Sequence, residues 1–390
     1  MNTLSKIGIF TLLLVSSLTI MVGSAIAPAL SGISENINID FPPRLLITLP
    51  SLGVIVFAPI IGKLTNKLGT FKLMCFGLIP YAVLGVLGAY LSNQYVLIVD
   101  RFLLGAATVA IQVSVTGMIA SLFSGESRMK IIAWQGMAIE LGGVVFLSIG
   151  GVLGEWHWQG PFYIYLIALI CLILVYYTLP KPAVAEEKTD NTSEKAQVSP
   201  KAKRRVLLIF MGSLFAMILF FIAFVTLPIY LDLVFNFTES ITGYYMAFIS
   251  VMAILTASQM PKVAKKFGDG SIVSFGFLFF ALGYVFFALA GSILFLGIAA
   301  VLLGIGFGLT VPLLNHMMIE ASTPQTMGKN LGLYSMGIFG GQFLSTFVGF
   351  ITDDYTILFA IASGLGVFVF VLLFFSFRAN NKLKASENLT

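Results

Sequence analysis

Three ionisable residues lie inside long apolar stretches of this chain. Arg101 and Asp100 are neighbours in the stretch 95–118, and Glu140 lies in the stretch 131–153. Ionisable side chains are costly inside a membrane and are usually kept there for proton or substrate transfer. A carboxylate that alternates between an arginine partner and none can take up and release a proton. Glu140, Arg101 and Asp100 are therefore the candidate proton-coupling residues.

Each of these residues also has a structural interpretation. Arg101 can form a structural salt bridge, for which Glu140 is the expected partner. Asp100 points about a quarter turn away from Arg101 on a helix. It also lies nearer the expected outer surface, so it can be a helix-end charge.

Polar and aromatic side chains at helical spacing are candidates for lining a substrate cavity. Thr108 and Gln112 follow Arg101 at i+7 and i+11, so the three share a helix face. Aromatic and Met side chains in the second half suit varied lipophilic solutes, although most of the 36 Phe residues must face lipid or core. The candidates there are Met217, Phe221, Phe224, Tyr245, Phe248, Asn315 and Gln342.

No catalytic or metal-binding constellation is present in the sequence. His157 and His316 are its only histidines and lie far apart, while Cys75 and Cys171 both fall in apolar stretches. Neither a G-x-S-x-G motif nor a phosphate-binding loop occurs. No catalytic residue, metal or cofactor is therefore expected. The chain is not expected to be an enzyme, and ATP hydrolysis by this chain alone is excluded as an energy source.

The composition predicts an all-α membrane protein. The chain has 390 residues, of which 58% are apolar and 10% charged, whereas soluble domains carry about 25% charged residues. One helical span needs about 20 apolar residues. The first apolar stretch is too long for a cleavable signal, so it is interpreted as a retained helix. Twelve transmembrane helices are expected, over 6–29, 45–63, 72–91, 95–118, 131–153, 160–179, 206–231, 241–260, 272–290, 293–317, 330–350 and 355–377.

The basic residues predict the orientation. If both termini are cytoplasmic, all of the 22 Lys and Arg residues except Arg44 and Arg101 fall in cytoplasmic segments. This asymmetry follows the positive-inside rule. It predicts a multi-pass protein of a bacterial-type cell (inner) membrane, and it explains the net charge of +5 without a nucleic-acid partner.

The chain divides into two similar halves around a polar segment. Residues 181–205 are charged and Ser/Thr/Pro-bearing, which predicts a cytoplasmic linker. The predicted domains are thus an N-terminal six-helix bundle at 1–180, a C-terminal bundle at 206–378 and a cytoplasmic tail at 379–390.

An offset of 199 residues aligns the two halves without gaps from the second helix to the fifth. Gly62–Gly69 falls on Pro261–Gly268, and Gly142 falls on Gly341. Two copies in the same orientation are typical of transporters, with the substrate site expected between them near the bilayer midplane.

The same offset confines the candidate proton relay to the first copy. Arg101 corresponds to Ala300, and Glu140 corresponds to Phe339. We therefore expect proton coupling in the N-terminal half, while the C-terminal half mainly shapes the substrate site.

Three motifs resemble those of the major facilitator superfamily, nearest its twelve-helix drug:proton antiporter branch. The family patterns are a G-x-L-x-D-R-x-G-R loop, R-x-x-Q-G in the fourth helix and a GG…W-R-W-x-F ending of the fifth. The resemblance implies two pseudo-symmetric six-helix bundles and alternating access, with a conformational latch at Gly62, Asn66, Lys67 and Gly69. The matching residues here are Gly62-x-Leu64-x-Asn66-Lys67-x-Gly69 with Lys72, Asp100-Arg101-x-x-Leu104-Gly105, and Gly150-Gly151-x-x-Gly154-x-Trp156.

Two positions depart from the family patterns. Asn66 stands where the loop usually has Asp, and Phe146-Leu147 stands where the antiporter motif has Gly-Pro. The second departure weakens an assignment to export more than it weakens the fold.

The sequence as a whole predicts a secondary active transporter. The expected activity is proton-coupled efflux of a small organic molecule, either a drug-like compound or a secreted metabolite such as a metallophore. The expected partners are this substrate, protons and the lipid bilayer, and a monomer is expected. The alternatives are a proton-coupled nutrient importer, a membrane-embedded enzyme and a sensor without transport.

Overall fold

The computed structural model describes residues 4–37, 40–181, 200–323 and 326–387, which form helices and short connections without a strand. Twelve helical segments in this part of the chain are long and apolar enough to cross a membrane, which confirms the twelve-helix prediction. The elements are α1 (Lys6–Ser24), η1 (Ala27–Ala29), α2 (Leu30–Asn36), α3 (Leu45–Leu68), α4 (Thr70–Leu87), α5 (Gln94–Leu122), α6 (Gly125–Trp156), η2 (Gly160–Leu166), α7 (Ile167–Thr178), α8 (Pro200–Phe235), α9 (Glu239–Phe267), α10 (Asp269–Ala288), α11 (Ile293–Glu320), α12 (Met327–Val348) and α13 (Tyr355–Glu387).

Some boundaries differ from the sequence expectation. The first span is interrupted by the 3-10 turn η1, where Pro28 at the start of the turn lacks a backbone N–H for an α-helical bond. Most of the predicted linker, residues 182–199, lies outside the described residues, and α8 begins at Pro200. At the other end, α13 continues to Glu387, well into the segment predicted as a tail.

The chain forms two compact units. The first contains residues 1–189 and 225–247, and the second contains residues 190–224 and 248–390. The end of α8 and the start of α9 thus belong to the first unit, although the sequence places both helices in the second half.

Two glycines at turns confirm the register of the internal repeat. Gly69 joins α3 to α4 with φ 77°, and Gly268 joins α9 to α10 with φ 83°. A positive φ is readily adopted by glycine and strained for other residues. The two residues are 199 positions apart, so the same tight turn recurs in both copies.

Close helix approaches also recur at this offset. A Cβ atom on Gly105 would stand 2.1 Å from the carbonyl oxygen of Pro50, so α5 and α3 approach closely there. In the second unit, a Cβ on Gly304 would stand 2.7 Å from the carbonyl oxygen of Ile249, which follows Pro50 by 199 residues. Small residues permit such approaches where lipid supplies no hydrophobic drive for helix association.

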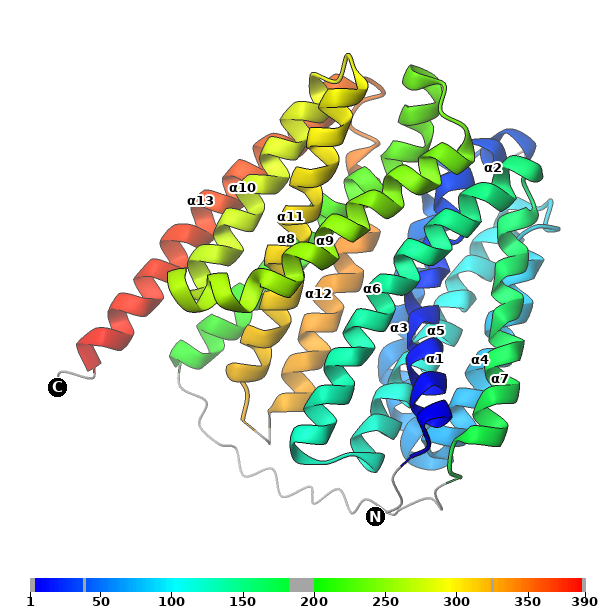
Figure 1. The fold of residues 1–390 in the computed structure, drawn as a ribbon, viewed down its shortest axis with the longest axis horizontal. Coiled ribbons are helices and arrows are strands. Elements are labelled where there is room, and N and C mark those ends of the chain that lie inside the picture. Colours follow the sequence, from blue (N-terminus) through cyan, green and yellow to red (C-terminus); the bar gives the residue numbers. More distant parts are fainter. Residues whose placement is uncertain (1–3, 38–39, 182–199, 324–325, 388–390) are drawn as a thin grey trace. The chain divides into compact units, whose positions relative to one another are not determined.

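Buried tyrosines connect helices within each unit. In the first unit, where α1 packs against α6 and α4 packs against α5 (Figure 1), the Tyr81 hydroxyl donates to the Leu18 carbonyl at 2.6 Å. Tyr165 donates to the Val22 carbonyl at 2.7 Å. In the second unit, where α10 packs against both α11 and α13, Tyr284 donates to the Leu219 carbonyl. A buried hydroxyl needs such a partner, so these contacts fix how α4, η2 and α10 pack.

Adding a methyl group at the repeated approach should destabilise the protein. In Gly105→Ala the new Cβ would stand 2.1 Å from the Pro50 carbonyl oxygen, and in Gly304→Ala it would stand 2.5 Å from the Met252 Cβ. Overpacking of this kind costs about 1–3 kcal/mol. Thermal unfolding of the purified protein in detergent should show a lower midpoint for both variants.

Gly136→Ala is the matched control, because nothing lies within 4 Å of its added Cβ. Its unfolding midpoint should not fall. Equal midpoints for the three variants would contradict the close-approach account.

Candidate functional site

Arg101 is completely buried and bonded to the neighbouring helix. Its Nη2 lies 2.6 Å from Asp100 Oδ2, and its Nε donates to the same oxygen at 2.9 Å. Nη2 also donates to the carbonyls of Leu84 at 2.6 Å and Gly85 at 3.3 Å. Both carbonyls lie near the C-terminal end of α4, where a cation is favourable. Arg101 therefore ties α5 to α4.

Aromatic rings complete the Arg101 pocket. The guanidinium carbon lies 5.6 Å from the centre of the Phe162 ring and 5.9 Å from that of Tyr165. These are distances at which the ring faces attract a cation. On the α4 side, a Cβ on Gly88 would stand 2.4 Å from Nη2, so the glycine leaves room for the guanidinium.

The structure corrects two sequence expectations about this pair. Asp100 is only 4% exposed and is the ion-pair partner of Arg101, so it is not a solvated helix-end charge. Arg101 bonds to Asp100 and α4 in place of the expected partner Glu140. The reason is the long Arg side chain, which turns back so that two adjacent residues meet despite their different helix faces.

Two polar atoms in this pocket have unused bonding capacity. Within the described part of the chain, Asp100 Oδ1 and Arg101 Nη1 are buried without a hydrogen-bond partner. The ion pair thus uses one oxygen of the carboxylate and leaves the other without a donor.

Two further polar residues of α5, Thr108 and Gln112, were predicted to line a substrate cavity. Thr108 is fully buried, and its hydroxyl donates to the Leu104 carbonyl of its own helix at 2.8 Å. Gln112 is half-buried. The donor of Thr108 is therefore already used within α5.

Glu140 is half-buried in the interior of the span Lys130–Trp156. The following residues of α6 approach α1, since a Cβ on Gly142 would stand 2.7 Å from Ser17 Cβ. Among the described residues, no hydrogen bond or ion pair of the Glu140 carboxyl group is found. Its environment therefore differs from that of Asp100, which has a cation beside it.

The predicted aromatic face of α8 is part of a larger cluster in the second unit. The rings of Phe221 and Phe224 stack with centres 4.9 Å apart. Phe220 contacts both, and its ring centre lies 4.4 Å from that of Phe307 on α11. The sequence analysis missed Phe220 and Phe307. The i, i+4 spacing of Phe220 and Phe224 was the available signal for the first.

The structure also brings α8 close to α12 in the second unit. A Cβ on Gly341 would stand 2.7 Å from the Met217 Cβ, and the neighbouring Gln342 is buried. Asn315 on α11 is half-buried. On α9, Tyr245 is half-buried and Phe248 is 40% exposed.

The predicted latch segment is the end of a helix. Gly62, Asn66 and Lys67 all lie within α3, which ends at Leu68, and Gly69 alone forms the turn to α4. Lys67 is exposed, and a Cβ on Gly62 would meet no atom within 4 Å. The motif thus marks a helix end followed by a one-residue turn.

Contacts within the first unit join segments from both halves of the sequence. Ser31 of α2 donates a hydrogen bond to Asp232 near the end of α8. Glu155 of α6 accepts a bond from the Ser240 amide of α9 at 3.2 Å. Asp232 is half-buried and accepts this hydrogen bond near the end of α8.

Close backbone packing accompanies these bonds. A Cβ on Gly151 of α6 would stand 3.1 Å from the Gly243 Cα of α9, and a Cβ on Gly243 would meet Gly151 equally closely. In the Gly-Gly ending of the fifth span, Gly151 therefore approaches α9, whereas a Cβ on Gly150 would stand 2.1 Å from the Ala25 carbonyl oxygen after α1.

Breaking the buried ion pair should cost much more stability than breaking an exposed one. Arg101→Leu leaves Asp100 buried without its cation, and removing one partner of such a pair costs about 3–5 kcal/mol. Arg205→Gln is the comparison, because its 3.4 Å pair with Glu320 is partly exposed and such pairs contribute about 1 kcal/mol or less. Thermal unfolding in detergent should rank the variants in this order, and equal losses would contradict the assignment of Arg101 as a structural tie.

The chain is similar in sequence to known membrane transporters. The sequence model of the Major Facilitator Superfamily matches residues 12–346. The multi-drug resistance efflux pump PmrA homolog of Lactococcus lactis is 24% identical over 351 residues, which cover 87% of this chain and 85% of that protein.

Two further relatives match shorter regions. The tetracycline resistance protein, class B, of Escherichia coli is 26% identical over 256 residues, which cover 63% of this chain and 62% of that protein. A triacylglyceride transporter of Mycolicibacterium smegmatis is 30% identical over 146 residues, or 36% of this chain. The matched region spans about a quarter (26%) of that relative's length.

Solved structures confirm the fold. The peptide transporter POT in complex with sulfate superposes with a TM-score of 0.76 at 12% identity, covering 96% of this chain and 95% of the other. The nucleoside transporter NupG superposes with a TM-score of 0.72 at 14% identity, covering 95% of this chain and 100% of the other.

Proposed function

Because this chain belongs to the Major Facilitator Superfamily, we propose that it is a proton-coupled exporter of small organic molecules. It is a multi-pass membrane transporter, and the described part of the chain has twelve helices long and apolar enough to span a membrane. Export as the direction of transport and the proton as the coupling ion are our proposal. From the distribution of basic residues, we propose a bacterial inner membrane with both termini in the cytoplasm. We also propose that the protein is a monomer.

The observation that carries the proposal is the contrast between two carboxyl groups. Asp100 has Arg101 2.6 Å away, whereas the Glu140 carboxyl has no ion-pair or hydrogen-bond partner among the described residues. A carboxyl group inside a span without a fixed partner is free to exchange its proton as the protein changes conformation. Glu140 is therefore the proposed proton carrier.

In this proposal the Asp100–Arg101 pair stabilises the packing of the helices. Its bonds to the Leu84 and Gly85 carbonyls hold α4 and α5 together. The second carboxylate oxygen of Asp100 has no partner in the described part of the chain, so this group is the second candidate for a proton.

The names of similar proteins support export as the direction of transport. A multi-drug resistance efflux pump homolog aligns over most of the chain, and tetracycline and quinolone resistance proteins align over parts of it. The proposed substrates are accordingly drug-like compounds or a secreted metabolite such as a metallophore. Aromatic side chains of α8, together with Met217 and Gln342, offer the apolar contacts with few polar groups that such solutes need.

A nutrient importer is the second candidate function. It is favoured by Phe146-Leu147, which replaces the Gly-Pro of the antiporter pattern. Uptake linked to acidification, without efflux, would identify it in the liposome assay described next.

Replacing Glu140 by glutamine should uncouple transport from the proton gradient. Glutamine keeps the shape of the side chain but cannot bind a proton, so gradient-driven accumulation should fall to that of protein-free liposomes. Downhill exchange of substrate should continue. The assay uses proteoliposomes with an imposed pH gradient and a panel of ethidium, tetracycline, a quinolone and an iron-chelating metallophore.

Glu320→Gln is the matched control, since Glu320 is exposed at the end of α11. It should accumulate substrate like the wild type. Full gradient-driven accumulation of substrate by the Glu140→Gln variant would contradict the proposal.

In alternating access one sequence repeat moves against the other. The bond between Ser31 of the first repeat and Asp232 of the second is therefore predicted to open during each transport cycle. A Ser31→Cys, Asp232→Cys pair in a background where Cys75 and Cys171 are serine should be cross-linked by a short bifunctional methanethiosulfonate, because the native side chains are in direct contact. Cross-linking should stop transport, and reduction should restore it. Unchanged transport by a fully cross-linked protein would show that this contact does not move.

A further inference from the structure

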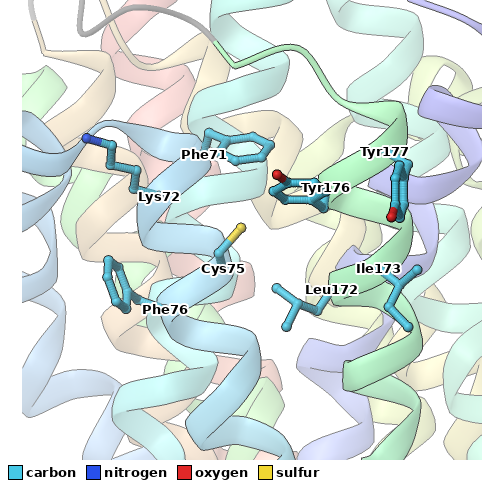
Figure 2. Close-up of a pocket in the computed structure, with 8 residues that line it drawn as sticks. All are labelled: Phe71, Lys72, Cys75, Phe76, Leu172, Ile173, Tyr176 and Tyr177. Carbon is cyan, nitrogen blue, oxygen red and sulfur yellow. The ribbon is translucent and has the colours of Figure 1, made fainter.

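A groove of about 570 Å³ runs between α4 and α7 in the first unit (Figure 2). This volume falls in the roughly 300–1,000 Å³ range of small-ligand sites. One wall comes from α4 and the other from α7, and neither includes a residue of the proposed transport machinery. The lining residues are Phe71, Lys72, Cys75, Phe76, Leu172, Ile173, Tyr176 and Tyr177.

The groove opens on the outer surface of two membrane-spanning helices. Its walls lie in the spans Thr70–Leu87 and Gly160–Thr178. Apolar side chains on both walls, Phe76 and Ile173, are exposed at its rim, while Cys75 lies half-buried between the walls (Figure 2). A groove of this composition on a membrane-spanning surface suits an acyl chain.

Positive charge is concentrated at one end of the groove. Lys72 lies on the α4 wall, and Lys181 follows the end of α7. The ammonium group of Lys181 lies 3.9 Å from the centre of the Tyr176 ring and 5.8 Å from that of Phe71, so two lining residues hold it at the mouth. None of the eight lining residues is acidic.

The corresponding seam in the second unit is built differently. Phe71 corresponds to Gly270, where a Cβ would stand 2.6 Å from the Phe377 Cβ of α13. Lys72 corresponds to Ser271. The phenylalanine ring and the Lys72 cation are therefore not needed to build the repeated fold, because the second copy has glycine and serine at these positions.

We propose that this groove binds one anionic phospholipid from the leaflet at the Lys72 end. Lys72 and Lys181 would hold the phosphate, and an acyl chain would lie along Cys75 and Leu172. Basic pockets between spanning helices recognise anionic headgroups in this way. The proposal is independent of the transported substrate and of the direction of transport.

The first test measures lipid retention. The protein is reconstituted in nanodiscs of equal phosphatidylglycerol and phosphatidylcholine, extracted in mild detergent, and weighed by native mass spectrometry. The wild type should retain one phosphatidylglycerol, and Lys72→Gln, Lys181→Gln should retain it on the order of tenfold less. The charge-keeping variant Lys72→Arg, Lys181→Arg should restore retention.

Arg378→Gln is the matched control. Its guanidinium lies 4.1 Å from the Phe374 ring centre on α13, so the variant removes a similar cation from the second unit. It should retain lipid like the wild type. Undiminished retention by the double-glutamine variant, or equal retention of phosphatidylcholine by the wild type, would overturn the proposal.

The second test uses a native cysteine as a reporter. Cys75 lines the groove, whereas Cys171 is fully buried and serves as the unreactive reference. Added phosphatidylglycerol should slow alkylation of Cys75 by an uncharged maleimide, and the double-glutamine variant should lose this protection. Protection by free glycerol phosphate alone, or none by phosphatidylglycerol, would exclude a lipid in the groove.

Discussion

The cost of a charge inside a membrane separates the structural ionisable residues of this protein from those available for transport. Such a charge must be paired, bonded or functional. Arg101 meets this constraint through Asp100, two carbonyls of α4 and two aromatic rings. Glu140 lies in the interior of another span, and the described residues give it no such partner. The proposed mechanism rests on this difference.

Duplication explains what surrounds these charges. The tight turns at Gly69 and Gly268 and the close approaches at Gly105 and Gly304 recur at one offset, so packing is a property of the repeated unit. We propose that function resides where the copies differ. The first copy has Arg101 and Glu140 where the second has Ala300 and Phe339. It also has the lysine-rimmed groove between α4 and α7.

Much of the fold could be predicted from the sequence because its signals are local. Runs of apolar residues mark spans, and glycines at a constant offset mark repeated turns and contacts. Contacts made by single side chains were harder to predict. The bond between Arg101 and Asp100 depends on the rotamer of a long side chain, and periodicity does not report rotamers.

Long-range contacts were beyond sequence reasoning for a different reason. The bond between Ser31 and Asp232 depends on how α2 and α8 pack, and the residues themselves resemble ordinary helix-end polar groups. The interaction of Phe220 with Phe307 likewise joins two helices far apart in the chain. The sequence offered many phenylalanines at suitable spacing, and only packing selects among them.

The most direct test of the account is whether substrate movement carries protons through Glu140. Proteoliposomes loaded with a pH-sensitive dye would receive a gradient of a transported compound, with no initial pH difference. The account predicts that the wild type changes the internal pH as substrate moves, and that the Glu140→Gln variant moves substrate without a pH change. An equal pH change in both proteins would contradict it.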